Sequence, residues 1–502
     1  MDRHDKRPRN QPLKTAAVLL LSVALCGLAS QSIFAQEITD KNITLFVETE
    51  LAHGEGVAAH RIDVSTREGV VSLSGNVGSL LAGERAVEIA QGVKGVRAVI
   101  DHLAVSPPPR SDQQILADLR QALQDDPATD VYEVSIMVQG GLVTLTGEVD
   151  SWAEKQICSQ VTKGVKGIKG LNNNLTLKQK AVRIDEEIEA DIKSRFRWDT
   201  RLSHDMIDID VEMGQVTLAG VVGSAAEKRR AHGDAWVGGV VSVDHDQLRV
   251  DPNLTGDRLR SGKYAGISDD RVAQAVKDAF EYDPRVAPFD IGVDVTAGIV
   301  TLTGITDNLK ARMSAEEDAM NTAGVWRVKN FIKVRSDLGS SQFPASLPYG
   351  TPGVMLEKIR AALARDPYVD QADISVTAVS RFRGTVYLDG MVDSEFEKRR
   401  AEDVVSRLRQ VVHIFNDIQV GREWRGKSDW EILQDIEGEL WWSPYVESDH
   451  IAVTVEDGIA ILTGVVEDLR ERRIATENAY EGGAREVRNF LKVRNGPPSL
   501  AP

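Results

Sequence analysis

Apolar residues alternate with hydroxyl-bearing residues in a short pattern that recurs six times along the chain. Val143–Thr146 and Val300–Thr303 both read Val-Thr-Leu-Thr, and alternation with a period of two predicts strands with one apolar face. Each strand ends in a glycine, and neighbouring glycines lie 72 to 86 residues apart. Such regular self-similarity indicates an array of small units rather than one large domain. The glycines, which we expect to be structural, are Gly75, Gly147, Gly220, Gly304, Gly390 and Gly464.

A helix is predicted to begin just after each glycine. The residue four positions on is one that caps helix N-termini. These residues are Ser79, Ser151, Ser224, Asn308, Ser394 and Asp468. A glutamate three residues later predicts a capping box in four repeats. These glutamates are Glu154, Glu227, Glu397 and Glu471.

A small residue recurs eleven positions after each glycine, which predicts close packing of the helix on its own sheet. The residue is alanine in five repeats and Cys158 in the second. Cys158 is therefore interpreted as a volume substitute for alanine, with a redox or partner-linking thiol as the alternative.

The rest of the repeat adds a helix and two strands. Val134–Val138 predicts a strand that pairs with Val143–Thr146 through a turn that contains Gly140 and Gly141. Upstream, Ile115, Leu119 and Leu123 have helical spacing, and an Asp-Pro or Ser-Pro pair ends this helix in four repeats. A glycine turn and a third, valine-rich strand follow the second helix. Each unit is thus helix, strand, strand, helix, strand.

This order resembles the BON domain of bacterial envelope proteins. The motifs that carry the resemblance are the Val-Thr-Leu-Thr-Gly strand, Ser-x-x-Glu-Lys, and the ending Gly-Val-x-x-Val-x-Asn-x-Leu-x-Val. The resemblance covers nearly the whole chain after the leader, although Gln410 replaces one turn glycine. It implies an α+β fold of six tandem BON-like domains, each a three-stranded sheet with two helices on one face.

The repeats set the expected boundaries. The domains are expected at 38–105, 112–178, 184–250, 269–335, 353–420 and 428–494, with linkers at 251–268 and 336–352 and a tail at 495–502.

Residues 1–35 have the pattern of a secretory signal peptide. Basic residues precede an apolar run from Ala16 to Leu28, and cleavage is expected after Ala35. The run is short for a membrane span, and no later segment is comparable, so we expect no span in the mature chain and a periplasmic location. Lipidation at Cys26 is disfavoured because Leu25 occupies a position that calls for a small residue. After cleavage Cys158 is the one remaining cysteine, which excludes an intramolecular disulfide.

The charge balance limits the possible partners. The chain has a net charge of −16, and the leader holds five cations and two anions, so the mature chain has a net charge of −19. This balance argues against general nucleic-acid binding and against adhesion to anionic lipid by overall charge. Only a local basic patch could bind such a surface.

Basic residues recur on the second helices. Their functional interpretation is contact with lipid or a protein partner, and the alternative is a solvated face paired with glutamates. The candidates are Lys155, Lys228, Arg229, Arg312, Lys398, Arg399, Arg472 and Arg473.

The sequence contains no recognisable catalytic constellation. No His-Glu-x-x-His, phosphate loop or Gly-x-Ser-x-Gly motif is present. Asp208, Asp210 and Glu212 lie on one strand face, where a solvated surface is favoured over a cation site. We therefore expect no enzyme activity, no metal site and no cofactor.

Two functions remain. The first is a periplasmic array making weak, multivalent contacts with envelope phospholipid or with periplasmic or outer-membrane proteins, as the resemblance implies. The second is a chaperone-like protein that protects against osmotic or envelope stress, whose sheet edges could accept an extended chain.

Overall fold

The computed structural model describes most of the chain from residue 37 onward. The residues outside the description are 1–36, 54–55, 130–132, 179–182, 255–262, 264–266, 336–351, 380–383, 393, 410, 422–426 and 495–502. The expected signal peptide, Cys26, Gln410, the tail and most of both linkers lie outside the described residues.

Six modules follow one another, each built as helix, strand, strand, helix, strand. Modules 1 and 2 comprise α1 (Asp40–His53), β1 (Ile62–Arg67), β2 (Val70–Val77), α2 (Leu80–Gln91) and β3 (Ala98–Val105), then α3 (Asp112–Asp125), β4 (Val134–Gln139), β5 (Leu142–Val149), α4 (Trp152–Lys163) and β6 (Gly170–Leu177). Module 3 comprises α5 (Asp185–Trp198), β7 (Ile207–Glu212), β8 (Gln215–Val222), α6 (Ala225–Asp234), β9 (Ser242–Asp244) and β10 (Leu248–Val250).

The last strand is interrupted in the later modules. Module 4 comprises α8 (Asp269–Tyr282), β11 (Ile291–Thr296), β12 (Ile299–Thr306), α9 (Leu309–Met320), β13 (Arg327–Asn330) and β14 (Lys333–Val334). Module 5 comprises α10 (Pro352–Arg365), β15 (Ile374–Val379), β16 (Thr385–Val392), α11 (Glu395–Ser406), β17 (His413–Asn416) and β18 (Gln419–Val420). Module 6 comprises α12 (Asp429–Trp442), β19 (Ile451–Glu456), β20 (Ile459–Val466), α13 (Leu469–Glu481), β21 (Glu486–Asn489) and β22 (Lys492–Val493).

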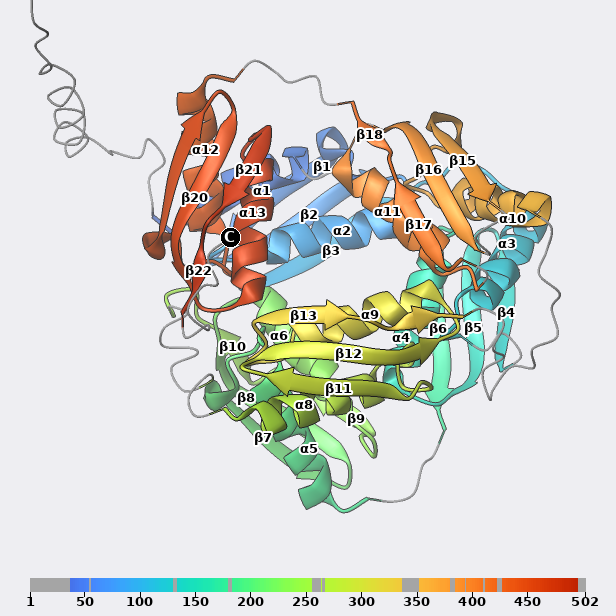
Figure 1. Ribbon diagram of the computed structural model, residues 1–502, viewed down its shortest axis with the longest axis horizontal. Coiled ribbons are helices and arrows are strands. Elements are labelled where there is room, and N and C mark those ends of the chain that lie inside the picture. The colour runs from blue at the N-terminus through green and yellow to red at the C-terminus, as the bar shows by residue number, and fades with distance from the viewer. Residues whose placement is uncertain are drawn as a thin grey trace, which may run out of the picture. The chain divides into compact units, whose positions relative to one another are not determined.

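The three strands of a module share one topology. In module 4, β11 and β12 form an antiparallel hairpin, and β13 and β14 pair parallel to β12 after the crossover through α9. Figure 1 shows β11, β12 and β13 side by side. The second strand is therefore central in the sheet, and the third strand lies at an edge. The predicted α+β fold is confirmed.

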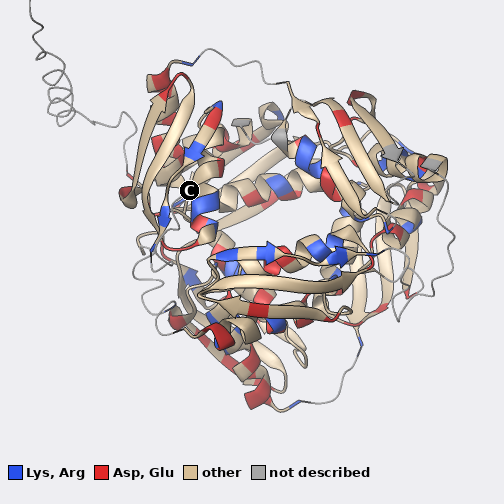
Figure 2. Ribbon diagram, viewed as in Figure 1, with Lys and Arg blue, Asp and Glu red and all other residues tan. Residues whose placement is uncertain are grey.

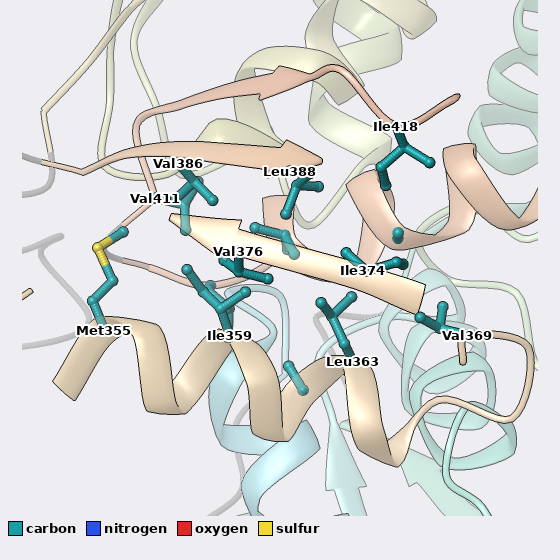
Figure 3. Close-up of a cluster of buried hydrophobic side chains, with 14 of the residues drawn as sticks. Met355, Ile359, Leu363, Val369, Ile374, Val376, Val386, Leu388, Val411 and Ile418 are labelled. Carbon is teal, nitrogen blue, oxygen red and sulfur yellow. The ribbon is translucent and has the colours of Figure 1, made fainter. Parts of the chain in front are cut away.

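Each module has its own apolar core between the sheet and its two helices. In module 5, Met355, Ile359 and Leu363 of α10 point toward Val376 and Leu388 of the sheet (Figure 3). The sheet face away from the helices carries the exposed positions of the strand alternation. Each module thus packs one face and leaves the other to solvent.

The six repeat glycines lie where the central strand approaches another backbone segment. Gly75 has φ +124° and pairs with Ile62, and a Cβ on it would lie 2.1 Å from the carbonyl oxygen of Arg61. The other five also have positive φ, and their Cβ would lie 2.0–2.8 Å from the equivalent carbonyl oxygen. An L side chain fits neither the backbone conformation nor the space.

An aspartate at the start of the first helix holds the hairpin turn. Asp40 accepts hydrogen bonds from the backbone N–H groups of Glu68 (2.7 Å) and Gly69 (2.8 Å). These turn residues both have positive φ, as a two-residue type I′ hairpin requires. The same pair of bonds is made by Asp112, Asp185, Asp269 and Asp429. The N–H bonds from Gly69 and Glu68 lower the pKa of Asp40.

The second helix begins as its sequence predicts, with one difference. All six predicted N-cap side chains accept a hydrogen bond from the backbone N–H three residues on. The predicted capping box is wrong for α4, α6 and α13, because Glu154, Glu227 and Glu471 accept from Asp150, Gly223 and Glu467, the residues before the cap. Glu227 also accepts from the N–H of Ser203, so its carboxylate ties the helix start to the loop after the first helix.

The small residues eleven positions after the glycines are all fully buried. Cys158 has no exposed surface, and burial raises the pKa of its thiol to about 12. A thiol that is inaccessible and protonated agrees with the interpretation of Cys158 as a volume substitute for alanine.

We predict that Gly75→Ala destabilises module 1 by about 2 kcal/mol or more, because the new Cβ overlaps a carbonyl oxygen in a strained conformation. Hydrogen exchange of β1 and β2 peptides in the full chain measures the change. Gly78→Ala is the matched control, since no atom lies within 4 Å of its Cβ. Equal exchange in the two variants would contradict the structural role of Gly75.

A second prediction concerns Asp40. Because its pKa is lower when folded, its contribution is complete above about pH 4 and is lost as the pH falls through the lowered pKa. At neutral pH, Asp40→Asn should speed exchange of the Glu68 and Gly69 amides by about tenfold. The turn at Gly140, held by Asp112, is the internal control. Unchanged exchange at Glu68 and Gly69 would show that the carboxylate does not hold this turn.

Candidate functional site

Five of the candidate basic residues share the position eight residues after the repeat glycine. They are Lys155, Lys228, Arg312, Lys398 and Arg472, and all are half-buried. Lys155 Nζ donates to the carbonyl oxygen of Leu175 at 2.7 Å, and Arg472 Nη2 donates to that of Asn489 at 3.1 Å. In modules 2 and 6, therefore, the charged group lies against the third strand of its own module.

The three remaining candidates have different surroundings. Arg229 forms an ion pair with Glu88 of module 1 at 3.4 Å, and Arg399 lies 3.9 Å from Glu477 of module 6. Arg473 is exposed. Within the described part of the chain, no two of the eight candidates share an acidic partner.

Two of the second helices contain three consecutive basic residues, at 228–230 and 398–400. The third residue of each forms an ion pair within its own module. Arg230 Nη2 lies 2.6 Å from Asp199, and Arg400 Nη2 lies 2.7 Å from Asp366. Each aspartate directly follows the first helix of the same module, so the pair joins the two helices. The prediction that basic residues pair with glutamates misses these partners, because an aspartate more than 30 residues away leaves no local signal.

The equivalent aspartate of module 2, Asp126, is bound by two other modules. Arg285 Nη2 of module 4 lies 3.2 Å from it, and Arg407 Nη1 of module 5 lies 3.8 Å from it. Burial opposes ionisation of Asp126, but Arg285 and Arg407 outweigh it and lower its pKa. The charge of this buried carboxylate is thus balanced across module boundaries.

Backbone hydrogen bonds also join the modules in pairs. The residue before the second turn glycine donates its N–H to the carbonyl at the end of another module's first helix. The three bonds are Lys94 to Trp442, Lys166 to Arg365, and Ala323 to Trp198, all 2.8 Å. They pair module 1 with 6, module 2 with 5, and module 4 with 3.

One exposed surface combines cations with an aromatic ring. Every second residue along the third strand of module 4 is exposed. These residues are Arg327, Lys329, Phe331, Lys333 and Arg335. We call these five residues the basic–phenylalanine stripe, and Figure 2 marks Lys and Arg along β13. The Phe331 side chain is 62% exposed, although its neighbour Ile332 is buried. Asn330 points to the helix side and donates to the carbonyl of Arg312, so the alternation continues through the strand interruption.

Module 6 has a related but weaker surface. Phe490 occupies the position of Phe331 and is 60% exposed, with Arg488 and Lys492 on either side. Arg488 is paired with Glu486 at 2.8 Å, which reduces the free positive charge. Module 2 has Asn172, Asn174 and Thr176 at the equivalent exposed positions. The stripe is therefore a property of particular modules rather than of the repeat.

Other candidate chemistry has structural surroundings. Asp208, Asp210 and Glu212 are exposed alternate residues of β7, as expected for a solvated strand face. A cavity of about 1060 Å³ is lined by residues of several modules, including Arg195, Arg230 and Asp234. Burial raises the pKa of Asp234 to about 7, although Arg230 and Arg195 oppose the shift from 3.0 and 3.1 Å.

In the described residues, no helix is both long enough and apolar enough to cross a bilayer.

The repeated architecture agrees with comparisons to known proteins. The BON domain family matches six segments that together span most of the chain. They are residues 39–107, 111–179, 184–252, 268–336, 355–422 and 428–495. The chain belongs to the BON domain family. The resemblance predicted from the sequence is confirmed.

Other comparisons add a relative and two structures. The chain is 32% identical over 146 residues to osmotically-inducible protein Y of Escherichia coli (strain K12), covering 28% of this BON protein and 73% of that protein. Two structures of CdsD, a structural protein of the type III secretion system of Chlamydia trachomatis, are 14% and 15% identical. The matches cover 41% and 46% of this chain, and 90% and 94% of the CdsD chains, each with a TM-score of 0.12. A TM-score this low carries no argument about fold or function.

Proposed function

We propose that this BON protein is a non-enzymatic periplasmic protein that makes weak, multivalent contacts with anionic phospholipid of the cell envelope. The observation that carries the proposal is the basic–phenylalanine stripe of module 4. Cations attract anionic headgroups, and an exposed phenyl ring gains by entering the interface between headgroups and acyl chains. The stripe presents both on the exposed sheet face of module 4.

The expected affinity of a single module for a membrane is weak, so useful binding needs contacts from more than one module. Each cation near an anionic membrane contributes about 1 kcal/mol, so Arg327, Lys329 and Lys333 together correspond to millimolar affinity. Insertion of Phe331 adds to this value. A second contact through Phe490 and its neighbours would then be intramolecular, which raises the avidity without a stronger single site.

The helix-2 candidates support this role less well. Lys155 and Arg472 donate to their own third strands, and Arg229 and Arg399 face carboxylates of other modules. Their charges are therefore partly neutralised before any membrane approaches. The net charge of −19 after the leader opposes adhesion elsewhere, so binding should depend on the local stripe.

A protective role in osmotic or envelope stress is the second proposal. It is supported by the similarity to a protein named for osmotic induction. In this role the exposed strand edges would hold unfolded envelope proteins, and slower aggregation of such proteins in the presence of the chain would support it.

We predict that Lys329→Glu weakens binding to vesicles rich in anionic phospholipid by about 30-fold, because one attraction is replaced by one repulsion. Phe331→Ser should also weaken binding, with less dependence on salt. Co-sedimentation of the full chain at low and high ionic strength measures both effects.

Lys277→Glu is the matched control, since Lys277 is an exposed residue of α8 in the same module. This variant should bind nearly as the unaltered chain does. Equal losses in Lys277→Glu and Lys329→Glu would show that net charge rather than the stripe governs binding. Absence of salt-sensitive binding by the intact chain would refute the lipid proposal.

A further inference from the structure

The first and last modules meet at an aromatic contact. Trp442, at the end of α12, is 3% exposed and packs into the core of module 1. Its ring stacks on Phe46 of α1 with centroids 5.0 Å apart, and its carbonyl accepts the N–H of Lys94. The Lys94 ammonium also lies 4.9 Å from the ring centre of Trp441. Trp441 and Trp442 of α12 therefore contribute directly to the contact between modules 6 and 1.

Three carboxyl groups lie beside this aromatic contact. Oxygen atoms of Glu50 (α1), Glu439 (α12) and Glu481 (α13) all lie within 4.8 Å of one another. Glu50 is one turn from Phe46, and Glu439 is one turn from Trp442. The acidic cluster and the aromatic stack thus share the same helix faces.

Glu50 and Glu439 occupy the same position, the eleventh residue of the first helix, in their modules. The other modules have Ala122, Arg195, Ala279 and Ala362 there. A carboxyl at this position thus occurs in the two modules that contact each other through it. The repeat itself does not call for an acid at this site.

Guanidiniums of α2 and α11 face the cluster. Arg85 of α2 is the guanidinium that faces Glu50 and Glu481, while Asp435 of α12 adds negative charge near Glu439. At Glu481, Glu477 of α13 raises the pKa and Arg399 of α11 lowers it. Full ionisation would place three carboxylates against the guanidiniums of Arg85 and Arg399, with Asp435 and Glu477 adding further negative charge.

Burial makes full ionisation costly when the modules are closed. Burial raises the pKa of Glu50 to about 7, and burial together with Glu50 raises that of Glu439. The pKa of Glu481 is also raised by burial. Glu50 and Glu439 form a hydrogen bond, which requires that one of the two carboxyl groups is protonated. Two neighbouring buried carboxyls hold such a shared proton readily.

We propose that the contact between modules 1 and 6 is a pH-sensitive latch. The latch is closed when Glu50 and Glu439 share a proton, and mutual repulsion opens it when both are ionised. This inference goes beyond the proposed envelope contact and does not depend on it.

The sign of the pH effect follows from the carboxyl groups. They bind protons more tightly in the closed state than in the open state, so closure is strongest below their ordinary pKa of about 4.5. The stabilisation is lost as the pH rises through about 7, the pKa of Glu50 in the closed state. Acidification therefore closes the latch.

The pairing of modules 2 and 5 lacks this device. There Arg365, at the position of Trp442, forms an ion pair with Asp125 at 2.7 Å. Opposite charges keep this contact closed across the same pH range. Opening is thus expected at the two ends of the array rather than throughout it.

Distances between spin labels on Ser65 of β1 and Thr454 of β19 test the latch in the full chain. Both residues are exposed, and Cys26 and Cys158 are replaced by Ser and Ala so that they do not react. We expect a narrow distance distribution at pH 5 and a broad one at pH 9. The ratio of closed to open molecules should fall on the order of 100-fold, since each tenfold difference in proton affinity between the states changes it tenfold.

Three variants make the result decisive. Glu50→Gln with Glu439→Gln keeps the hydrogen-bonding shape without charge and should stay narrow at both pH values. Glu48→Gln, an exposed change on the same helix, should behave as the unaltered chain, and Trp442→Ala should be broad throughout. An unaltered chain that is narrow at pH 9 while Trp442→Ala is broad would overturn the proposal. Opening of the double Gln variant at high pH would overturn it as well.

Discussion

One backbone contact recurs in every module, and the rest of the module is arranged around it. The central strand passes so close to the carbonyl before the first strand that a Cβ at the repeat glycine would lie 2.0–2.8 Å from its oxygen. This approach sets the hairpin register, Gly75 opposite Ile62 in module 1. The helix cap lies four residues on, and the buried small residue lies eleven on. The glycine, the cap and the buried small residue thus keep the same sequence spacing in all six modules.

The sequence predicted these features because they are local. Strand alternation, N-caps and turn glycines act within a few residues, and all six caps form as expected. The aspartate that holds the hairpin turn in five modules has no local signal, because its partners lie 28 and 29 residues away. A search for acids at a constant distance before the turn glycines would have found it. Contacts such as Trp442 in the core of module 1 leave no such periodic signal, since each pair of modules uses different side chains.

Functional surfaces should therefore be sought where modules differ. Several basic residues of the second helices form hydrogen bonds with the third strand of their own module, or ion pairs with aspartates of the same module and with glutamates of neighbouring modules. The stripe of module 4 and the carboxyls of modules 1 and 6 occur in particular modules only. The stripe has a visible sequence signature, since its cations alternate over residues 327–335. Because the stripe occurs in one module, the positions that all six modules share do not reveal it.

The most direct measurement is hydrogen exchange of the full chain with and without vesicles of anionic phospholipid. If the stripe makes the contact, peptides covering residues 327–335 should gain protection most, with a smaller gain at 486–494 and little change at 170–177 of module 2. Protection confined to the second helices, or equal protection of all six third strands, would contradict the account.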